Sequence, residues 1–338
     1  MAETAPPRWR RRLLTGGYLV AVAAVGLAVL EIAARSLGLG DPILYHATVA
    51  GGLRPLPSQS VERVGGARVT IDASGVRSAS TTADTAALRV LYLGDSVTWG
   101  GSRTDDADTF AEVAADALRQ QSGSVYAMNA GVNGTSLLNA ADVYRTYADS
   151  VDAVVWLFPW GDVTRSYASL GPLWPARLTP RLALVEAVDQ VLFRYWLPAL
   201  RERGGTAEDF EVAEFPPGYA EVGRRELAAR QDSNLAAARR VLRDARQRGL
   251  PLVLGVTPTL DGAAPAPLAP AARAFLADAD TLGAAIFDVH ASVDAAGGPD
   301  GLFLDAVHLT TEGHRVVGEA LGAVLVRQLA APSSPADS

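Results

Sequence analysis

The chain has 338 residues, of which 49% are hydrophobic and 20% are charged, so it is long and apolar enough to bury a full-sized core. Its formal net charge is −7, and no basic stripe with interleaved aromatic residues lies beyond the extreme N-terminus, which argues against nucleic acid as a partner. It contains no cysteine, which excludes disulfides, cysteine nucleophiles and thiolate metal sites. These features predict a globular protein with one substantial domain.

The N-terminus carries a membrane-spanning pattern. Four arginines between positions 8 and 12 precede an uncharged, mainly apolar run from Leu13 to Leu30. At about 1.5 Å per residue this run gives roughly 27 Å of helix, close to the hydrocarbon thickness of a bilayer. Arg35 alone follows the run closely, and this asymmetry predicts a cytoplasmic N-terminus. We expect a cytoplasmic basic tail at 1–12, a transmembrane helix at 13–34 and an extracytoplasmic remainder, as in a single-pass protein of the cell membrane.

A cleaved signal peptide shares the basic start and the apolar middle of this pattern. Its apolar region usually has only about 7–15 residues and ends at a cleavage site with small residues. Here residues 31–36 read Glu-Ile-Ala-Ala-Arg-Ser, which is a different pattern. The length of the run and the missing cleavage site favour an uncleaved anchor. The basic cluster in front of a run that is apolar on all faces also favours an anchor over a buried core helix.

Residues 35–87 are rich in Gly, Pro, Ser and Thr and are predicted to form a juxtamembrane connector. Two short β-prone runs, Val61 to Val64 and Ala67 to Ile71, flank a Gly-Gly pair, which is the pattern of a β-hairpin. A plain linker fits the same composition. Under either interpretation the main domain begins at about residue 88.

From residue 88 to residue 330, short apolar runs alternate with longer amphipathic segments. The runs have the length and character of strands buried on both faces: Leu88 to Leu93, Val125 to Asn129, Ala153 to Phe158, Pro251 to Val256 and Ala284 to Val289. The predicted helices are Thr109 to Gln120, Ser136 to Ala148, Arg224 to Arg248, Pro270 to Leu282 and Thr311 to Leu329. This order predicts an α/β fold, a three-layer α/β/α sandwich with a five-stranded parallel sheet of the flavodoxin-like kind. Five strands without a fixed repeat argue against a closed barrel.

Residues 164–223 interrupt the alternation and contain several aromatic residues, among them Trp174, Phe193 and Trp196. We interpret this stretch as an insertion over or beside the site. Its aromatic side chains fit either the lining of a substrate groove or ordinary packing at helical spacing. The last residues, 331–338, are predicted to be a disordered tail.

The first predicted strand ends in Gly94-Asp95-Ser96, just before the next helical segment. A serine at this edge of a parallel sheet has an exposed hydroxyl and lies near free backbone N–H groups that can stabilise an oxyanion. On its own, however, a Gly-Asp-Ser turn also serves as a helix cap. A nucleophile therefore needs a second piece of the sequence to support it.

That second piece lies near the C-terminus, where Asp305 and His308 stand three residues apart before the last predicted helix. A serine hydroxyl is nearly un-ionised at neutral pH and needs a base with a pKa near 7, which an imidazole supplies. A carboxylate beside the imidazole fixes its tautomer and stabilises the imidazolium that forms during attack. Ser96, His308 and Asp305 are thus candidates for nucleophile, base and orienting group.

Over residues 88–330 these blocks resemble the SGNH/GDSL hydrolase family, which has a Gly-Asp-Ser block after its first core strand and an Asp-x-x-His block near its C-terminus. The resemblance implies that Ser96 is the nucleophile, with His308 and Asp305 as its partners, and that the Ser96 N–H belongs to the oxyanion hole. The block from Asn129 to Gly134 is similar to the family's glycine block, which implies that the Gly131 N–H is the second oxyanion donor. Residues 71–77, Ile-Asp-Ala-Ser-Gly-Val-Arg, are similar to a segment of membrane-anchored bacterial members.

One block departs from the family. The family has Gly-x-Asn-Asp after the third strand, and its asparagine side chain is the third oxyanion donor. Here Pro159 stands in place of the glycine and Gly161 in place of the asparagine, and only Asp162 is kept. Loss of one oxyanion donor typically costs about 10²- to 10³-fold in rate. Asn133, two residues beyond Gly131, is the candidate substitute donor.

Two other histidines compete with His308 for the role of base. His314 falls in the last predicted helix, where packing or capping is the ordinary role. His290 follows Asp288 at the end of the fifth predicted strand, where sites occur. Four histidines without a His-x-x-x-His pair and without cysteine make a zinc site improbable, and no phosphate-binding glycine loop is present, so no cofactor is implied.

The sequence therefore predicts an extracytoplasmic, membrane-anchored serine esterase or deacylase that acts on acyl esters, with O-acetyl esters the first candidates, through an acyl-enzyme. A sugar hydroxyl in place of water would make the same site a cell-surface glycan O-acyltransferase. The glycine at 161 also fits a catalytically weakened binding or assembly protein. Fold alone does not separate these alternatives.

Overall fold

The computed structural model describes residues 8–47, 53–79, 85–165, 174–175, 182–191, 219–261 and 264–330. Its centre is a five-stranded sheet in the order β12-β9-β7-β5-β6, and every neighbouring pair is parallel. The strands are β5 (Leu88–Leu93), β6 (Val125–Asn129), β7 (Ala153–Pro159), β9 (Leu252–Thr257) and β12 (Ala285–Ile286). In chain order this is the 2-1-3-4-5 arrangement of doubly wound folds, whose switch point lies between the first and third strands, β5 and β7. The predicted fold class is confirmed.

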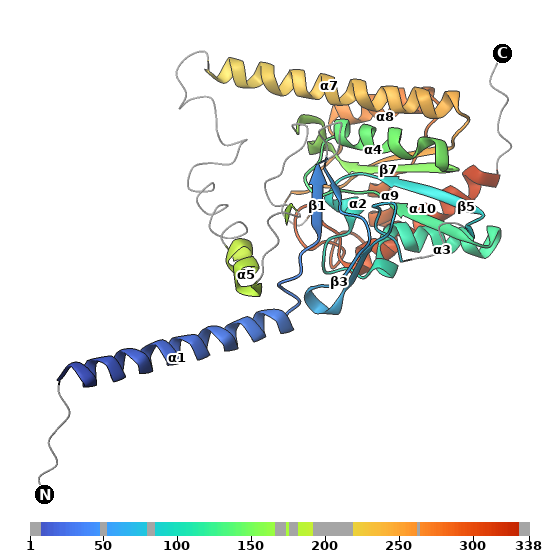
Figure 1. Ribbon diagram of the computed structural model, residues 1–338. Helices are drawn as coiled ribbons and strands as arrows, with labels where there is room; N and C mark the ends of the chain where they lie inside the picture. The colour runs from blue at the N-terminus through green and yellow to red at the C-terminus, as the bar shows by residue number, and fades with distance from the viewer. Residues whose placement is uncertain are drawn as a thin grey trace, which may run out of the picture.

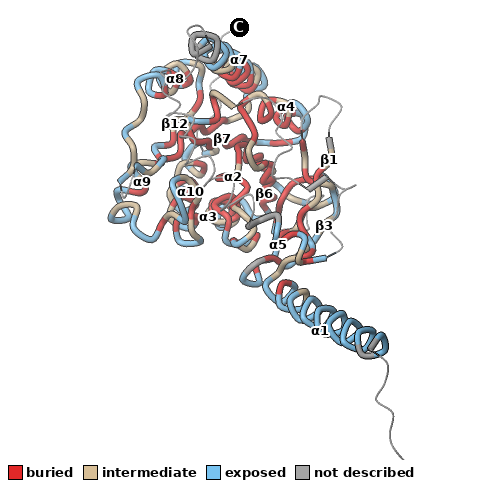
Figure 2. Tube along the Cα trace, turned by 90° about the vertical axis from the view of Figure 1, so that its left-hand side faces the viewer, coloured by how far each residue is buried: buried red, intermediate tan, exposed pale blue. Residues whose placement is uncertain are grey.

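Helices cover both faces of the sheet (Figure 1). On one face lie α4 (Leu137–Tyr147), α7 (Tyr219–Gln247) and α8 (Pro270–Thr281), which share a hydrophobic cluster with one side of the strands. On the other lie α3 (Phe110–Ser122), α9 (Val289–Ala295) and α10 (Thr311–Ala330), which form the second cluster. The central strands β5 and β7 send alternate side chains into both clusters, as period-two geometry requires. Figure 2 shows this buried centre.

Most predicted element bounds lie within a few residues of the observed ones. The prediction for the fifth strand is wrong at its C-terminal end, since β12 holds only Ala285–Ile286 and residues 289–295 are helical. Asp288 is the reason, because its carboxylate accepts the Ala291 N–H at 2.9 Å and caps α9. His290 therefore lies on a helix and not at a strand end.

The connector is well structured in its described parts. Strands β3 (Gln59–Glu62) and β4 (Arg68–Ile71) form an antiparallel hairpin whose turn includes Gly65 and Gly66, both with φ near +80°. Only glycine adopts that backbone freely. A second small sheet joins β1 (Leu44–Ala47), β2 (Leu53–Pro55) and β8 (Trp174–Pro175). The described residues also contain α2 (Ser96–Trp99), α5 (Ala183–Val191), β10 (Leu260–Asp261), β11 (Ala264–Pro265) and 3₁₀ turns at Val64–Gly66, Asp106–Asp108, Ala148–Ser150 and Trp160–Thr164.

Helix α1 (Arg8–Ser36) projects from the domain, and its 12–36 portion is long and apolar enough to cross a membrane. Most of its residues are exposed and are drawn in pale blue in Figure 2, whereas Ala34 near its end is buried. An exposed apolar helix of this length near the N-terminus is typical of a membrane span and also of a signal sequence. The predicted insertion at 164–223 and the predicted tail at 331–338 lie mostly outside the described residues.

Candidate active site

Ser96 lies at the carboxyl end of β5, on the switch point of the sheet. The chain turns there through Gly94, which has φ of 155°, and Asp95, whose carboxylate accepts the Val97 N–H at 2.9 Å and caps α2. A Cβ on Gly94 would lie 2.1 Å from Thr98 Oγ1 and 2.2 Å from the Leu157 carbonyl oxygen. Only glycine therefore permits the tight turn that exposes the Ser96 hydroxyl.

The loop before α10 brings His308 and Asp305 to the same edge. The loop is closed by the Leu304 N–H, which donates to the His308 carbonyl at 2.7 Å. The Asp305 Oδ1 atom accepts the N–H groups of Val307 at 3.0 Å and His308 at 2.9 Å. These bonds fix the carboxylate under the imidazole, whose Nδ1 lies 2.8 Å from Asp305 Oδ2.

The other ring nitrogen of His308, Nε2, contacts the Ser96 hydroxyl. His308 Nε2 lies 2.8 Å from Ser96 Oγ, although the two residues are 212 positions apart. The hydroxyl also has Asp95 Oδ2 at 3.2 Å, but it carries one proton and the contact with the imidazole is the shorter. The three predicted residues are thus hydrogen-bonded in the order carboxylate, imidazole, hydroxyl.

Asp305 is kept as a carboxylate. Burial raises its pKa, but the N–H groups of Val307 and His308, together with the imidazole, outweigh burial and leave the pKa below its usual value. An ionised carboxylate holds the Nδ1 proton of the ring and leaves Nε2 free to accept a proton from Ser96.

A hollow of about 440 Å³ opens in front of Ser96. Asp305 and His308 belong to its lining, and Asn133, Arg103 and Arg165 add polar groups. Its size admits a small acyl group together with part of the alcohol to which the group is bound.

Of the predicted oxyanion donors, the Ser96 N–H is the best placed. It is the first N–H of α2, and within the described parts of the chain it has no hydrogen-bond acceptor. The Gly131 N–H instead donates to Asn129 Oδ1 at 3.1 Å, so a role in oxyanion stabilisation requires that bond to open. Gly131 also packs so closely that a Cβ would lie 2.4 Å from the Trp99 nitrogen. Asn133 lies in the lining of the hollow, where its amide can reach a bound substrate.

Residues 159–162, which differ from the family pattern, lie at the end of β7 and in the 3₁₀ turn that follows. Gly161 is exposed, and a Cβ there would meet no atom within 4 Å, so packing does not require a glycine. Asp162 is buried, and burial followed by the nearby charge of Asp95 raises its pKa well above the usual value. Arg165 lies 3.0 Å from Asp95 and 3.1 Å from Asp162 and balances both carboxyl groups.

Arg165 is a site residue that the sequence analysis missed. Its guanidinium is about one-third exposed and lies in the lining of the Ser96 hollow. The only sequence signal is an arginine three positions after Asp162, and the 3₁₀ turn brings these two side chains together. Its contact with Asp95 places this cation beside the turn that carries Ser96.

Of the rival histidines, His314 also belongs to the lining of the Ser96 hollow, whereas His290 does not. His314 is buried and stacks on Phe110 at a centroid distance of 5.7 Å, and its Nδ1 accepts the Phe110 N–H at 3.3 Å. Burial, followed by the charge of Arg77, lowers its pKa to about 3, which makes it a poor proton acceptor. Burial also lowers the pKa of His290, which lies on α9 and outside the lining of the Ser96 hollow.

Arg77 links the connector to the site and was also missed. It is fully buried, and its guanidinium donates to Asp106 at 2.8 Å and to the carbonyl oxygens of Trp99 at 2.7 Å and Gly101 at 2.8 Å. These bonds hold the chain that leaves α2. The segment at 71–77 therefore supports the turn that carries Ser96.

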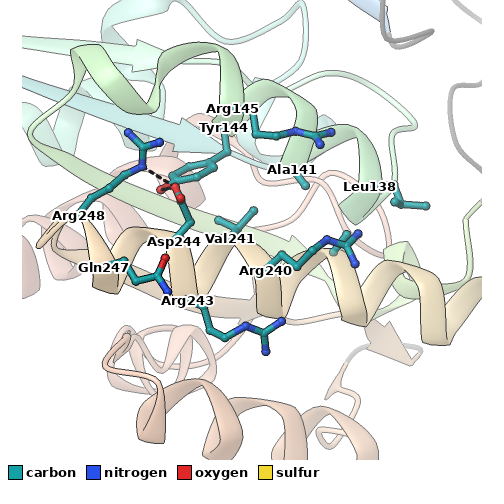
Figure 3. A pocket seen from close by; sticks show the side chains of 11 residues that line it. Leu138, Ala141, Tyr144, Arg145, Arg240, Val241, Arg243, Asp244, Gln247 and Arg248 are labelled. Carbon is teal, nitrogen blue, oxygen red and sulfur yellow. Dashed lines mark hydrogen bonds and ion pairs between the residues drawn. The ribbon is translucent and has the colours of Figure 1, made fainter.

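A second hollow lies between α4 and α7 and shares no lining residue with the first (Figure 3). Its polar groups bond to one another, since Asp244 accepts the Tyr144 hydroxyl at 2.7 Å and the Arg248 Nε–H at 2.6 Å. Among the described residues no group of three or more His, Asp or Glu side chains is arranged to hold a metal ion.

The fold and the site define an open α/β sandwich with a serine, a histidine and an aspartate in a hydrogen-bonded series at the carboxyl edge of its sheet. No protein-family model and no curated protein matches the chain. Similar solved structures include Axe2, an acetylxylan esterase from Geobacillus stearothermophilus (14% identity, TM-score 0.40, 74% of this chain and 98% of that one). They also include a member of the lipolytic protein G-D-S-L family from Veillonella parvula (12%, 0.39, 71% and 100%) and LAE5, an alpha/beta hydrolase enzyme from the metagenome of Lake Arreo, Spain (13%, 0.39, 71% and 96%).

Proposed function

We propose that this chain is a membrane-anchored, extracytoplasmic serine esterase or deacylase of the SGNH/GDSL kind that cleaves acyl esters, O-acetyl esters first among them. The observation that carries the proposal is the contact series Ser96 Oγ to His308 Nε2, 2.8 Å, and His308 Nδ1 to Asp305 Oδ2, 2.8 Å. A structural serine at a helix start needs its hydroxyl only for capping, whereas here the adjacent Asp95 is the cap.

The chemistry follows from these atoms. Ser96 Oγ attacks the ester carbonyl carbon while His308 Nε2 takes its proton, and Asp305 stabilises the imidazolium. The carbonyl oxygen becomes an oxyanion that the Ser96 N–H stabilises. Collapse of this intermediate breaks the bond to the alcohol, which leaves with the proton from His308. Water then attacks the acyl-enzyme by the same route and releases the acid.

The hollow has a polar wall where the ester would bind. This wall consists of the guanidinium groups of Arg103 and Arg165, which are charged at neutral pH, and the amide of Asn133. Such a wall suits an ester whose alcohol carries hydroxyl groups, as a glycan does, better than a long-chain lipid ester. We therefore infer a short acyl group on a polar alcohol as the substrate class. Since Gly161 has no amide to donate to the oxyanion, we expect the side chain of Asn133 to donate that hydrogen bond instead.

The anchor is proposed on the contacts of the last turns of α1. Ala34 is buried, and Glu31 accepts two backbone N–H groups from α5. A signal peptide is removed after targeting and has no reason to complete the packing of the mature domain. Sequencing of the N-terminus of the protein recovered from washed membranes tests this point, and a mature N-terminus beyond residue 36 would contradict it.

Activity is tested on the full chain in detergent with p-nitrophenyl acetate and with an acetylated oligosaccharide. Ser96→Ala removes the nucleophile, and Ser102→Ala is the matched control because Ser102 lies in the lining of the same hollow. We expect loss of hydrolysis in Ser96→Ala alone. Equal activity in the wild type and Ser96→Ala would refute the assignment, and release of product only when an acceptor sugar is added would redefine the enzyme as an acyltransferase.

A further inference from the structure

Helix α5 is fixed to the extracytoplasmic end of α1. The Glu31 carboxylate on α1 accepts the Ala183 N–H at 2.9 Å and the Leu184 N–H at 3.0 Å, which are the first two backbone donors of α5. Arg35, one turn later on α1, lies 2.8 Å from the same carboxylate. The start of α5 is therefore at the depth of the last turns of α1, as their neighbouring positions in Figure 1 show.

A second set of contacts, made by Glu186, fixes how α5 is rotated about its own axis. Glu186 is buried and accepts the Gly40 N–H at 2.7 Å, and it pairs with Arg63, which is also buried. Arg63 donates in addition to the Asp41 carbonyl at 3.0 Å. Since Glu186 must point toward the domain to make these contacts, the side of α5 on which it lies faces inward.

The outward side is apolar. Val185 and Val188 of α5 are 47% and 56% exposed, and Leu182, just before the helix begins, is 52% exposed. Val185 and Val188 are three residues apart, so they lie on one side of α5. Beyond residue 37, the described chain exposes only two other large hydrophobic side chains to a similar degree, at positions 227 and 304. The exposed apolar surface of the domain is thus concentrated at the point where the chain leaves the membrane.

We propose that α5 is an interfacial helix whose Val185 and Val188 face, with Leu182 just before its start, lies in the headgroup and acyl boundary of the bilayer. A lipid surface is the occupant because α5 is bonded to the end of a helix that crosses that surface, and an amphipathic helix parallel to the membrane buries this kind of face. The inference rests on the membrane anchor of the proposed function. It adds a second contact that sets the orientation of the domain, which a single helix leaves free to rotate.

The absence of cysteine in the chain makes the test direct, because a single introduced cysteine is the only site of labelling. Full-length Val188→Cys carries an environment-sensitive NBD fluorophore in phosphatidylcholine vesicles. Val25→Cys on α1 is the control for lipid, and Ser233→Cys on the exposed side of α7 is the control for water. Circular dichroism of each labelled protein checks its fold.

We expect a blue-shifted emission for the Val188 label and quenching by nitroxide lipids comparable to that at Val25, with neither effect at Ser233. If the Val188 label shows neither the blue shift nor the lipid quenching, as expected for Ser233, while the Val25 label shows both, the interfacial helix is refuted and the membrane anchor is still supported. Blue-shifted emission without lipid quenching means that protein covers the face, which also overturns it. If Val25 is in water, the anchor and the interfacial helix both fail, while hydrolysis by Ser96 is judged separately by the Ser102 and Ser96 variants.

Discussion

His314 should make the folded state sensitive to acid, and the substitution that tests this is His314→Gln. The imidazole is buried against Phe110 beside the Arg77 cation, and its pKa is lowered to about 3 in the folded protein. In the unfolded chain a histidine has a pKa of about 6.5. The unfolded state therefore binds the proton first as the pH falls.

The sign and size of the effect follow from that difference. Above about pH 6.5 neither state is protonated at His314, and the residue adds no pH dependence. From about pH 6.5 to about pH 3 the unfolding free energy falls by up to about 1.36 kcal/mol for each pH unit. At about pH 4.5, two units below the unfolded pKa, the loss from this residue is about 2.7 kcal/mol. Glutamine does not titrate, so the variant lacks this part of the loss.

The assay is urea unfolding of the full chain in detergent at several pH values between about 7 and about 4.5. His46→Gln on strand β1 is the matched control, since it makes the same change outside the buried core. The wild type and the control should show the acid loss, and His314→Gln should show a shallower slope, even if it is less stable at neutral pH. Parallel pH curves for the wild type and His314→Gln would refute the reasoning.

Four further predictions concern the site and the anchor. Asn133→Ala should lower kcat by about 10²- to 10³-fold if its amide replaces the missing donor, and an unchanged rate of ester hydrolysis would exclude it. Asp305→Asn should lower kcat by about 10²- to 10⁴-fold with little change in the melting temperature, because the carboxylate acts on His308. Gly94→Ala should cost roughly 4 kcal/mol or more in urea unfolding, whereas Gly161→Ala, with no atom near its Cβ, should cost little. Glu31→Ala should speed hydrogen exchange at the amides of residues 183 and 184, whose acceptor it removes, and protection equal to the wild type would show that α5 does not depend on Glu31.

The central sheet was predictable because its strands are buried on both faces. Strands β5 and β6 have the predicted bounds, since each is a short apolar run closed by glycine or asparagine. The Asp305 and His308 pair was also predictable, because residues three apart in a tight loop meet through local bonds alone. The contact between Ser96 and His308 could not be predicted from local sequence. The two residues are 212 positions apart, and the doubly wound topology brings them together.

The missed features depend on contacts that leave no periodic pattern. Arg77 lies in a glycine- and serine-rich segment, and its role appears only when the chain brings it to Asp106 and Trp99. Arg165 becomes part of the site through two carboxyl groups that the 3₁₀ turn and the β5 turn place together. The early end of the fifth strand depends on one side-chain cap, which outweighs the apolar pattern around it.

The most direct test of the account is the site of covalent modification. The full-length protein is treated with a fluorophosphonate probe, digested and mapped by mass spectrometry, beside Ser96→Ala and Ser102→Ala. The account predicts one adduct on Ser96 in the wild type and in Ser102→Ala, and none in Ser96→Ala. An adduct on another residue, equal labelling of all three proteins, or no labelling of the wild type would contradict Ser96 as the nucleophile.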